Sequence, residues 1–373
     1  MSETKQTRRR PPTVRDVAKL AGFSPATVTR ALRGDTLVRP ETRQRIQVAA
    51  AQIGYRPNIV ARALVTQRTS ALGVIIPEIG DGFWGSIVSG IEQKAAAEGF
   101  SVLLASSHDR VEDEAKAVEV LLSNQVDGVI VGSALRRPRD ARERLSSTAP
   151  TVFVDCDIPF QPADIQAAST LPVATVLSRV LRSQRSAGHP SIAFDDLDAS
   201  RLVVDHLVCL GHEQIGFVGG APVRSSLLRL LGLRSALEAQ GGSLSAVIDC
   251  ARTLQAGLDA GTALLSRADR PTAIVAYDDL VAIGVVRAAH AHGLSVPHDV
   301  SVVGFDDIEV ASYVEPPLTT VRQPTRRMGN LAVELVLSQL RGEEPDAWHL
   351  LPGELVERES TGSPKQLTHM PGA

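Results

Sequence analysis

The stretch Thr13–Gly34, TVRDVAKLAGFSPATVTRALRG, constrains the fold more than any other part of this chain. Its first half has apolar residues at helical spacing, at Val14, Val17, Ala18 and Ala21. Gly22 then allows the left-handed backbone of a sharp turn. Ser24 is a good N-cap and Pro25 suits the first position of a helix, so a second helix follows. The stretch therefore predicts a helix-turn-helix.

The second helix of this motif has two distinct faces. Small and polar residues face outward, namely Ala26, Thr27, Thr29, Arg30 and Arg33. Apolar residues face inward, namely Val28, Ala31 and Leu32. A slim helix that carries arginine fits the major groove of DNA. The same spacing also occurs in helix pairs that have no role in DNA binding.

The distribution of charge favours the DNA-binding alternative. Residues 1–68 hold 14 lysines and arginines against four acids, a net charge of +10, whereas the rest of the chain carries −13. The overall charge of −3 therefore hides a basic head on an acidic body. Neutralisation of phosphates by such a head gives sequence-independent affinity that falls with salt.

The length of 373 residues suits two or three domains. No run approaches 18 apolar residues, and the N-terminus lacks the apolar core of a secretory signal, so we expect a cytoplasmic protein that acts on the nucleoid. The cysteines Cys156, Cys209 and Cys250 form no CxxC pair. We expect them to be buried thiols in a reducing compartment rather than disulfides or metal ligands.

The N-terminal part divides into three expected segments. Residues 1–12 form a disordered basic tail, residues 13–56 a headpiece, and residues 57–69 a hinge helix and linker. A third helix from about Pro40 to Ile53 completes the headpiece. The hinge is too short to be stable alone, so we expect it to order only with DNA and a partner copy.

From Ala71 onward, apolar runs alternate with amphipathic helices. The expected strands are Ala71–Ile76, Phe100–Ala105, Val126–Gly132, Thr151–Val154, Ser191–Phe194, Ile215–Gly219, Ala246–Ile248, Ala273–Ala276 and Ser301–Phe305. The expected helices are Trp84–Glu98, Glu112–Ser123, Ala199–Leu210, Leu227–Gln240, Gln255–Arg267 and Leu280–His292. This alternation predicts an α/β core of two doubly wound parallel-sheet lobes, which bind ligands beyond the carboxyl ends of their strands.

Many ordered motifs resemble those of the LacI/GalR family of bacterial transcriptional regulators. They are the head itself, then ETRQRI, IGYRPNIVARAL, LGVIIP, GIEQKAAAEGF, VDGVIV, HLVCLGHEQIGFVGG, RPTAIVAYDDLVAIGVVRAAHAHGLSVPHDVSVVGFDD and PPLTTVRQP. The resemblance covers nearly everything from Thr13 to about Thr361. It implies a helix-turn-helix head and hinge helix joined to a core similar to periplasmic sugar-binding proteins, a homodimer, and a pseudo-palindromic double-stranded DNA operator.

The resemblance also implies which residues contact DNA. The base-reading positions of the second helix match Pro25, Ala26 and Arg30, of which Arg30 can pair with guanine. Ser24, Thr27 and Thr29 are expected to hold phosphates. Leu64 matches the hinge leucine that wedges into the minor groove, and Asn58 is a further hinge contact. The alternatives are a solvated Arg30 and a Leu64 that packs on the core. Arg39-Pro40 departs from the small polar cap that the family often has.

The effector-binding positions implied by the resemblance lie along the core. They are Asp81, Phe83, Trp84, Asp155, Arg229, Asp278, Asp306 and Gln323. Asp278 and Asp306 also fall at the carboxyl ends of expected strands, where such sheets bind ligands, and this position does not depend on the resemblance. Phe83 and Trp84 are expected to stack on a ligand, with core packing as the alternative. Asp155 is followed by Cys156 where the family often has arginine.

Carboxylates, an arginine and two rings suit a polyhydroxylated ligand, so we expect a sugar or sugar derivative as the effector. A purine or nucleoside is the alternative, and so is a constitutive DNA-binding protein with a non-functional cleft. We expect a repressor, and the effect of the ligand on DNA binding stays open between release and promotion.

The core is expected to span residues 70–361, followed by a tail at 362–373. The first lobe comprises about 70–157 and 324–345, and the second about 190–322. Residues 158–189 form an insertion relative to the family, whose role stays open between ligand access, partner contact and none. The tail has no leucine heptad, so no tetramer beyond the dimer is predicted.

Other classes of protein fit less well. The chain has no GxGxxG or P-loop pattern, so we expect neither an enzyme nor a nucleotide cofactor. His290 and His292 are two apart on one helix and cannot share a metal ion as an i, i+4 pair could, so we expect no metal site. The basic head argues against a secreted solute-binding protein.

Overall fold

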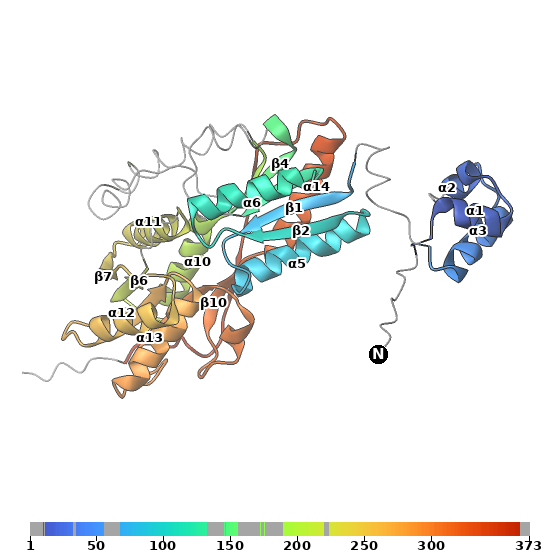
Figure 1. Cartoon of the computed structure of the whole chain (residues 1–373). Coiled ribbons are helices and arrows are strands. Elements are labelled where there is room, and N and C mark those ends of the chain that lie inside the picture. The colour runs from blue at the N-terminus through green and yellow to red at the C-terminus, as the bar shows by residue number, and fades with distance from the viewer. Residues whose placement is uncertain are drawn as a thin grey trace, which may run out of the picture. The chain divides into compact units, whose positions relative to one another are not determined.

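The computed structural model describes residues 10, 12–32, 35–55, 68–132, 145, 147–155, 172, 175, 189–219 and 224–365. They belong to two compact units, one within residues 1–69 and the other within residues 70–373 (Figure 1).

The first unit is a three-helix headpiece. Its helices are α1 (Val14–Ala21), α2 (Pro25–Leu32) and α3 (Pro40–Gln52). They enclose a small core of Val17, Ala18, Ala21, Val28, Ala31, Val38, Ile46, Ala49 and Ala50. At the start of α1, the Thr13 amide donates to the Asp16 carboxylate at 2.7 Å. Gly22 ends α1 with a φ of 76°, so the turn has the left-handed residue that the sequence predicts. The helix-turn-helix prediction is confirmed.

The second unit holds two six-stranded sheets, mostly parallel. The first has the order β11-β5-β4-β3-β1-β2 and the second the order β12-β10-β9-β8-β6-β7. The first sheet consists of β1 (Ala71–Ile76), β2 (Ser101–Ser106), β3 (Gly128–Gly132), β4 (Thr151–Val154), β5 (Ser191–Phe194) and β11 (Trp348–Leu351). The second consists of β6 (Ile215–Val218), β7 (Leu244–Ile248), β8 (Ala273–Ala276), β9 (Ser301–Asp306), β10 (Thr319–Arg322) and β12 (Glu354–Val356). The two-lobed prediction is confirmed.

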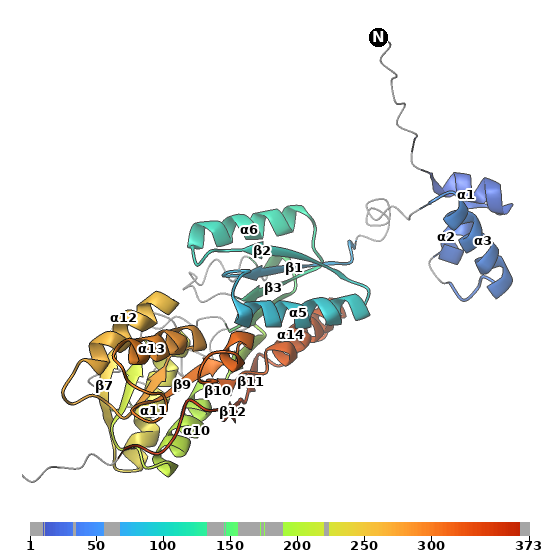
Figure 2. The ribbon, with the colours of Figure 1, turned by 90° about the horizontal axis from the view of Figure 1, so that it is seen from below.

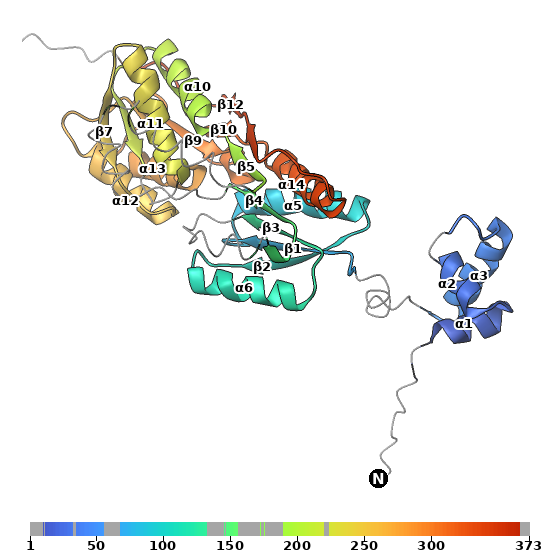
Figure 3. The same cartoon turned by 90° about the horizontal axis from the view of Figure 1, so that it is seen from above.

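Helices cover both faces of each sheet, as Figures 2 and 3 show. On the first lobe, α5 (Gly82–Ala97) and α14 (Thr325–Leu340) cover one face and α6 (Val111–Ser123) the other. On the second lobe, α12 (Leu254–Leu265) and α13 (Asp279–Ala291) lie opposite α10 (Asp196–Cys209) and α11 (Arg224–Ala239). The short helix η1 (Glu309–Ser312) follows β9.

The chain passes between the lobes three times, after β5, after β10 and after β11. This corrects the predicted lobe boundaries. Ser191 of β5 pairs with Phe153 of β4 and with Trp348 of β11, so residues 191–194 belong to the first lobe and not to the second. A short apolar strand shows no sign of its sheet in the sequence, because only its pairing partners decide that.

Several predictions about local features differ from the structure. The strands β10, β11 and β12 are absent from the predicted set, because their residues hold as strands through pairing with segments far away in the sequence. Cys209 is exposed at the end of α10 and Cys250 is half-buried, so the prediction of buried thiols is wrong for both. Cys156 and nearly all of the insertion lie outside the described residues.

Among the described helices, none combines the length and the apolar character needed to cross a bilayer.

Candidate functional site

Helix α2 presents an exposed face on the headpiece. Ser24, Pro25, Ala26 and Arg30 are exposed, and Thr27 and Thr29 are half-buried. Val28 and Ala31 point into the core, as predicted. The exposed face therefore consists of small side chains with one arginine.

The hydroxyl groups of α2 have local partners, whereas its arginine does not. The Thr27 amide donates to Ser24 Oγ at 3.1 Å, which makes Ser24 the N-cap of the helix. Thr29 Oγ1 donates to the Pro25 carbonyl at 2.8 Å. Within the described part of the chain, no side-chain hydrogen bond or ion pair engages Arg30. Its guanidinium keeps all five donors for an outside partner. The hinge candidates Asn58 and Leu64 lie outside the described residues.

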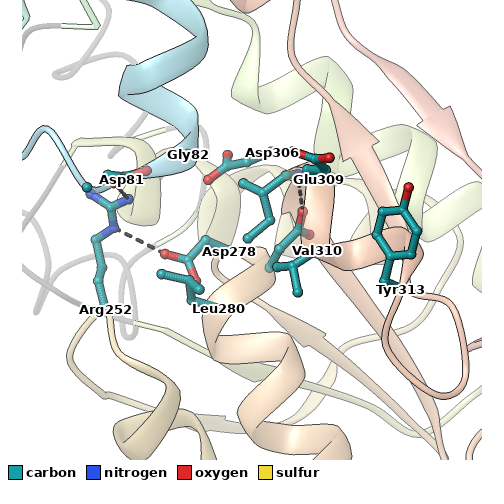
Figure 4. Close-up of a pocket in the computed structure, with 12 residues that line it drawn as sticks. Asp81, Gly82, Arg252, Asp278, Leu280, Asp306, Glu309, Val310 and Tyr313 are labelled. Atoms are coloured by element: carbon teal, nitrogen blue, oxygen red, sulfur yellow. Dashed lines mark hydrogen bonds and ion pairs between the residues drawn. The ribbon is translucent and has the colours of Figure 1, made fainter.

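A cleft separates the two lobes of the second unit. Gly82, at the start of α5, faces Ile308 of the second lobe, and a Cβ added there would lie 3.6 Å from the Ile308 side chain, an ordinary van der Waals distance. One pocket, of about 450 Å³, lies beside this contact and is lined among others by Asp81, Asp278 and Asp306 (Figure 4). A second pocket shares Gly82, Ile308 and Asp306 and adds Gln323. Both volumes suit small molecules.

Two predicted aspartates face one another across the first pocket, and an arginine joins them. Asp81 caps α5 by accepting from the Phe83 amide at 2.9 Å, and Asp278 caps α13 by accepting from the Val281 amide at 2.8 Å. Arg252, from the loop after β7, donates to Asp278 at 3.1 Å and to Asp81 at 3.2 Å. Figure 4 shows its guanidinium between the two carboxylates.

Arg229 lies deeper, at the base of the cleft. The residue is 2% exposed, and its Nε donates to Asp196 Oδ1 at 2.9 Å. Its other nitrogens donate to the Tyr277 carbonyl and pair with Asp306 Oδ1 at 3.5 Å. The guanidinium carbon lies 4.5 Å from the centre of the Phe305 ring, in cation–π contact. Arg229 therefore positions Asp306 and offers little free surface to a ligand.

Asp306 also holds Gln323. The Gln323 amide donates to Asp306 Oδ1 at 2.6 Å, while Gln323 Oε1 is buried and has no hydrogen-bond partner among the described residues. Asp306 itself has a φ of 106°, a backbone conformation that few non-glycine residues adopt. Such strain at the end of β9 fits a residue held in place for function.

Burial makes two cleft carboxylates titrate near neutral pH. It raises the pKa of Asp306 to about 6. It also raises the pKa of Asp155 to about 7, with a further contribution from the neighbouring Asp196. Asp155 has a left-handed φ of 47° at the end of β4. The Asp306 carboxyl, which lines both pockets, can therefore donate a hydrogen bond to a ligand when it is protonated and accept hydrogen bonds when it is ionised.

Phe83 and Trp84 do not lie as a stacking surface in this structure. They are 5% and 2% exposed, form an edge-to-face pair at 5.2 Å, and belong to the core of the first lobe. A Cβ at Gly132 would lie 2.2 Å from the Trp84 ring, so that glycine makes room for the indole. Both rings therefore pack in the core, as the alternative prediction had it. Phe83 also reaches the edge of the second pocket.

The structure adds cleft residues that the sequence did not point to. Arg252 and Asp196 complete the two charged clusters, Arg224 joins Asp196 at 3.4 Å, and Tyr313 lines the first pocket while 79% exposed. Asp196 lies two residues after the end of β5, so its place beside the end of a predicted strand could have identified it. Arg252 and Tyr313 lie in loops, where no pattern of spacing marks them.

Comparisons with family models cover both units. Residues 13–58 match the model described as "Bacterial regulatory proteins, lacI family". Residues 204–361 match the one described as "Periplasmic binding protein-like domain".

Similar proteins match nearly the whole chain. The transcriptional regulator GalS of Salmonella typhimurium is 32% identical over 352 residues, which are 93% of this chain and 96% of that protein. The transcriptional repressor CytR of Escherichia coli is 32% identical over 356 residues, which are 94% of this chain and 96% of that protein. These relatives are named as regulators and not as enzymes.

Solved structures agree with this result. The lac repressor dimer bound to operator and the anti-inducer ONPF has 30% identity and a TM-score of 0.79, and the match covers 95% of this chain and 100% of that one. The complex of the transcriptional regulator CelR with cellobiose has 28% identity and a TM-score of 0.66, over 94% and 99% of the two chains.

Proposed function

The chain belongs to the LacI family of bacterial transcriptional regulators, and from this premise we propose that it is a repressor controlled by a small molecule. In this proposal a homodimer binds a pseudo-palindromic operator through its headpieces. A sugar or sugar derivative binds in the cleft between the lobes and changes the affinity for DNA. The domain plan is a headpiece at 13–56, a hinge at 57–69 and an effector-binding core at 70–361.

The observation that carries the DNA-binding part is the exposed face of α2. Arg30 is free to read a guanine, while Pro25 and Ala26 offer apolar contacts and Ser24, Thr27 and Thr29 offer hydroxyls to phosphates. The dimer supplies two such helices to two half-sites, and the hinge with Asn58 and Leu64 contacts the minor groove between them. The lac repressor dimer, solved on its operator, supports this arrangement.

The observation that carries the effector part is the set of carboxylates around the first pocket. Asp278 and Asp306 lie at strand ends of the second lobe and Asp81 lies opposite in the first. Carboxylates accept hydrogen bonds from neighbouring hydroxyl groups, and the unpartnered oxygen of Gln323 adds another acceptor. This acceptor-rich lining favours a polyol, whose neighbouring hydroxyl groups can donate to these oxygens. The CelR complex with cellobiose is consistent with a sugar.

Coupling between the two sites needs different affinities of the effector for two arrangements of the lobes. Asp81 and Gly82 begin α5 of the first lobe, whereas Asp278 and Asp306 belong to the second. A ligand that touches both lobes therefore favours one arrangement over others. The first lobe leads into the hinge, so its arrangement in the dimer bears on operator binding.

The test is a thermal-unfolding screen of the full chain against sugars, sugar phosphates, nucleosides and purines. A ligand at about 100 times its Kd stabilises the fold by roughly 2.7 kcal/mol, which a melting curve resolves. A sugar hit that disappears in Asp278→Asn supports the proposal, because asparagine keeps the cap of α13 but removes the carboxylate. A nucleoside hit overturns the sugar assignment. If no compound stabilises the chain, a constitutive DNA-binding protein becomes the better description.

The regulatory part is tested by titrating the chain with DNA selected from a random duplex library, with and without the hit. A change in affinity of at least about fivefold is expected, the lower range of allosteric coupling. Equal affinities would mean that the ligand is not the effector.

A further inference from the structure

We propose that Arg252 is a latch that holds the two lobes together across the cleft when no effector is bound. It belongs to the second lobe and reaches Asp81 of the first lobe at 3.2 Å. On its own lobe it pairs with Asp278 at 3.1 Å. One guanidinium thus joins the helix starts of α5 and α13, which lie on opposite sides of the first pocket (Figure 4).

All three groups are held in position before they pair. Asp81 and Asp278 are fixed as N-caps of their helices, so pairing costs them little conformational freedom. The guanidinium carbon of Arg252 lies 5.5 Å from the centre of the Tyr277 ring, which supports it from one side.

The latch is also shielded from water. The side chains of Arg252, Asp81 and Asp278 are 24%, 17% and 2% exposed. Ion pairs at this depth are screened less by salt than pairs on the open surface, where many contribute nothing measurable. The pair therefore keeps more of its attraction than an exposed pair would.

Beside the latch, Gly82 of the first lobe faces Ile308 of the second lobe, and a Cβ added to Gly82 would lie 3.6 Å from the Ile308 side chain. This approach is apolar and involves no side chain of the first lobe, so it does not determine how the two lobes are oriented. The ion pair supplies the directional link. Opening the cleft separates Arg252 from Asp81 and exposes both charges, whereas the bond to Asp278 stays within the second lobe.

The latch uses the carboxylates that a ligand would use. Asp81, Asp278 and Arg252 all line the first pocket. A ligand that donates hydrogen bonds to Asp278 or Asp81 has to share them with Arg252 or displace it. The apparent affinity of the effector is then lowered by the stability of the latched state, a consequence that rests on the proposed function. The latch itself is a property of the ligand-free chain and is tested there.

The experiment measures the distance between the lobes in the full chain without ligand. One spin label is attached to the native Cys209 of the second lobe and another to Glu112→Cys on α6 of the first, with Cys156 and Cys250 replaced by alanine. Excess unlabelled chain keeps the labelled pairs apart in dimers. Double electron–electron resonance then gives the distribution of distances between the two labels.

Two variants break the latch differently. Asp81→Asn removes the cross-lobe charge, and asparagine still caps α5. Arg252→Met removes the guanidinium but keeps a long side chain. The matched control is Lys94→Met, which removes an ion pair between α5 and α14 inside the first lobe at 3.2 Å. Circular dichroism confirms that each variant is folded.

We expect both latch variants to move the distribution by several ångströms and to broaden it, while the control leaves it unchanged. The double variant should match either single one, because both remove the same link. An unchanged distribution in Asp81→Asn overturns the proposal, even if Arg252→Met does not fold. So does a double variant whose shift is the sum of the two single shifts. Either result leaves the proposed function untouched, since operator binding and effector binding are measured separately.

Discussion

Helix α2 and the cleft differ in how strongly their functional side chains are engaged by the rest of the protein. The face of α2 comes from eight consecutive residues, and Arg30 on it has no side-chain partner in the described structure. The cleft assembles its side chains from distant segments, and Arg229 and Arg252 are both held by carboxylates. Changes to the face of α2 should therefore alter recognition alone, whereas changes in the cleft should alter recognition and stability together.

The largest effect is expected for Arg229→Met. This substitution leaves Asp196 and Asp306 buried without their shared cation, and breaking a buried ion pair in this way costs about 3–5 kcal/mol. Urea unfolding of the full chain measures the loss in the core transition. Arg201→Met is the control, because Arg201 pairs with Asp198 on the open surface, where a loss within about 1 kcal/mol is expected. Similar losses in the two variants would remove the distinction between cleft and surface.

Arg30→Ala should show the opposite pattern. The free energy of unfolding should change by less than about 0.5 kcal/mol, because the side chain is exposed. Discrimination between operator and point-changed operators should fall by about 1–3 kcal/mol at the position that Arg30 reads. Competition binding against single-base variants measures this loss. Arg15→Ala, exposed on α1, should weaken all sequences alike. If discrimination survives in Arg30→Ala, another residue reads the base.

The contrast between a local site and one assembled from distant segments also explains what the sequence could predict. The headpiece follows from local signals, since the spacing of Val17, Val28 and their neighbours, the glycine turn and the serine cap all act within a few residues. Asp278 and Asp306 could be placed because each lies at the carboxyl end of a strand of a parallel sheet. Arg252 could not, because its role depends on two helix starts that only the tertiary fold brings together.

The burial of Phe83 and Trp84 could not be predicted for a similar reason. A pair of rings at a strand-to-helix turn suits a ligand platform and a lobe core equally well by sequence. Gly132, on a neighbouring strand, leaves the space that the indole fills, and such complementarity between distant positions has no local signature. The assignment of β5 to the first lobe depended in the same way on pairing that the sequence does not display.

A smaller effect is expected where a residue of α2 does serve the structure. Ser24→Ala removes the acceptor of the Thr27 amide and should destabilise α2 by about 1 kcal/mol. Amide hydrogen exchange of α2 in the full chain measures this as faster exchange of about fivefold, with the core unaffected. Ser24→Asp is the control, because aspartate also caps a helix and favours its N-terminus, so exchange should stay slow. Slow exchange in both variants would mean that the Ser24 side chain, like that of Arg30, does not stabilise the helix.

A pH-dependent effect is expected for the Asp155 carboxyl at the end of β4. Burial raises its pKa to about 7 from an ordinary value of 3.8, so the folded state is favoured when the group is protonated. This contribution is fully present below about pH 3.8 and is lost as the pH rises through about 7. Asp155→Asn replaces the titratable carboxyl with an amide, while Asp306 and the neighbouring arginines stay in place.

The variant should therefore gain stability relative to the parent chain at pH 8, and that gain should shrink toward pH 5. Urea unfolding of both chains at a series of pH values gives the difference between them, in which all other titrations cancel to first order. A difference that does not change between pH 5 and pH 8 would mean that Asp155 is solvated and ionised throughout. In that case Asp155, like Arg30 on α2, could be replaced without loss of stability. The difference between the two regions would then rest on the arginines alone.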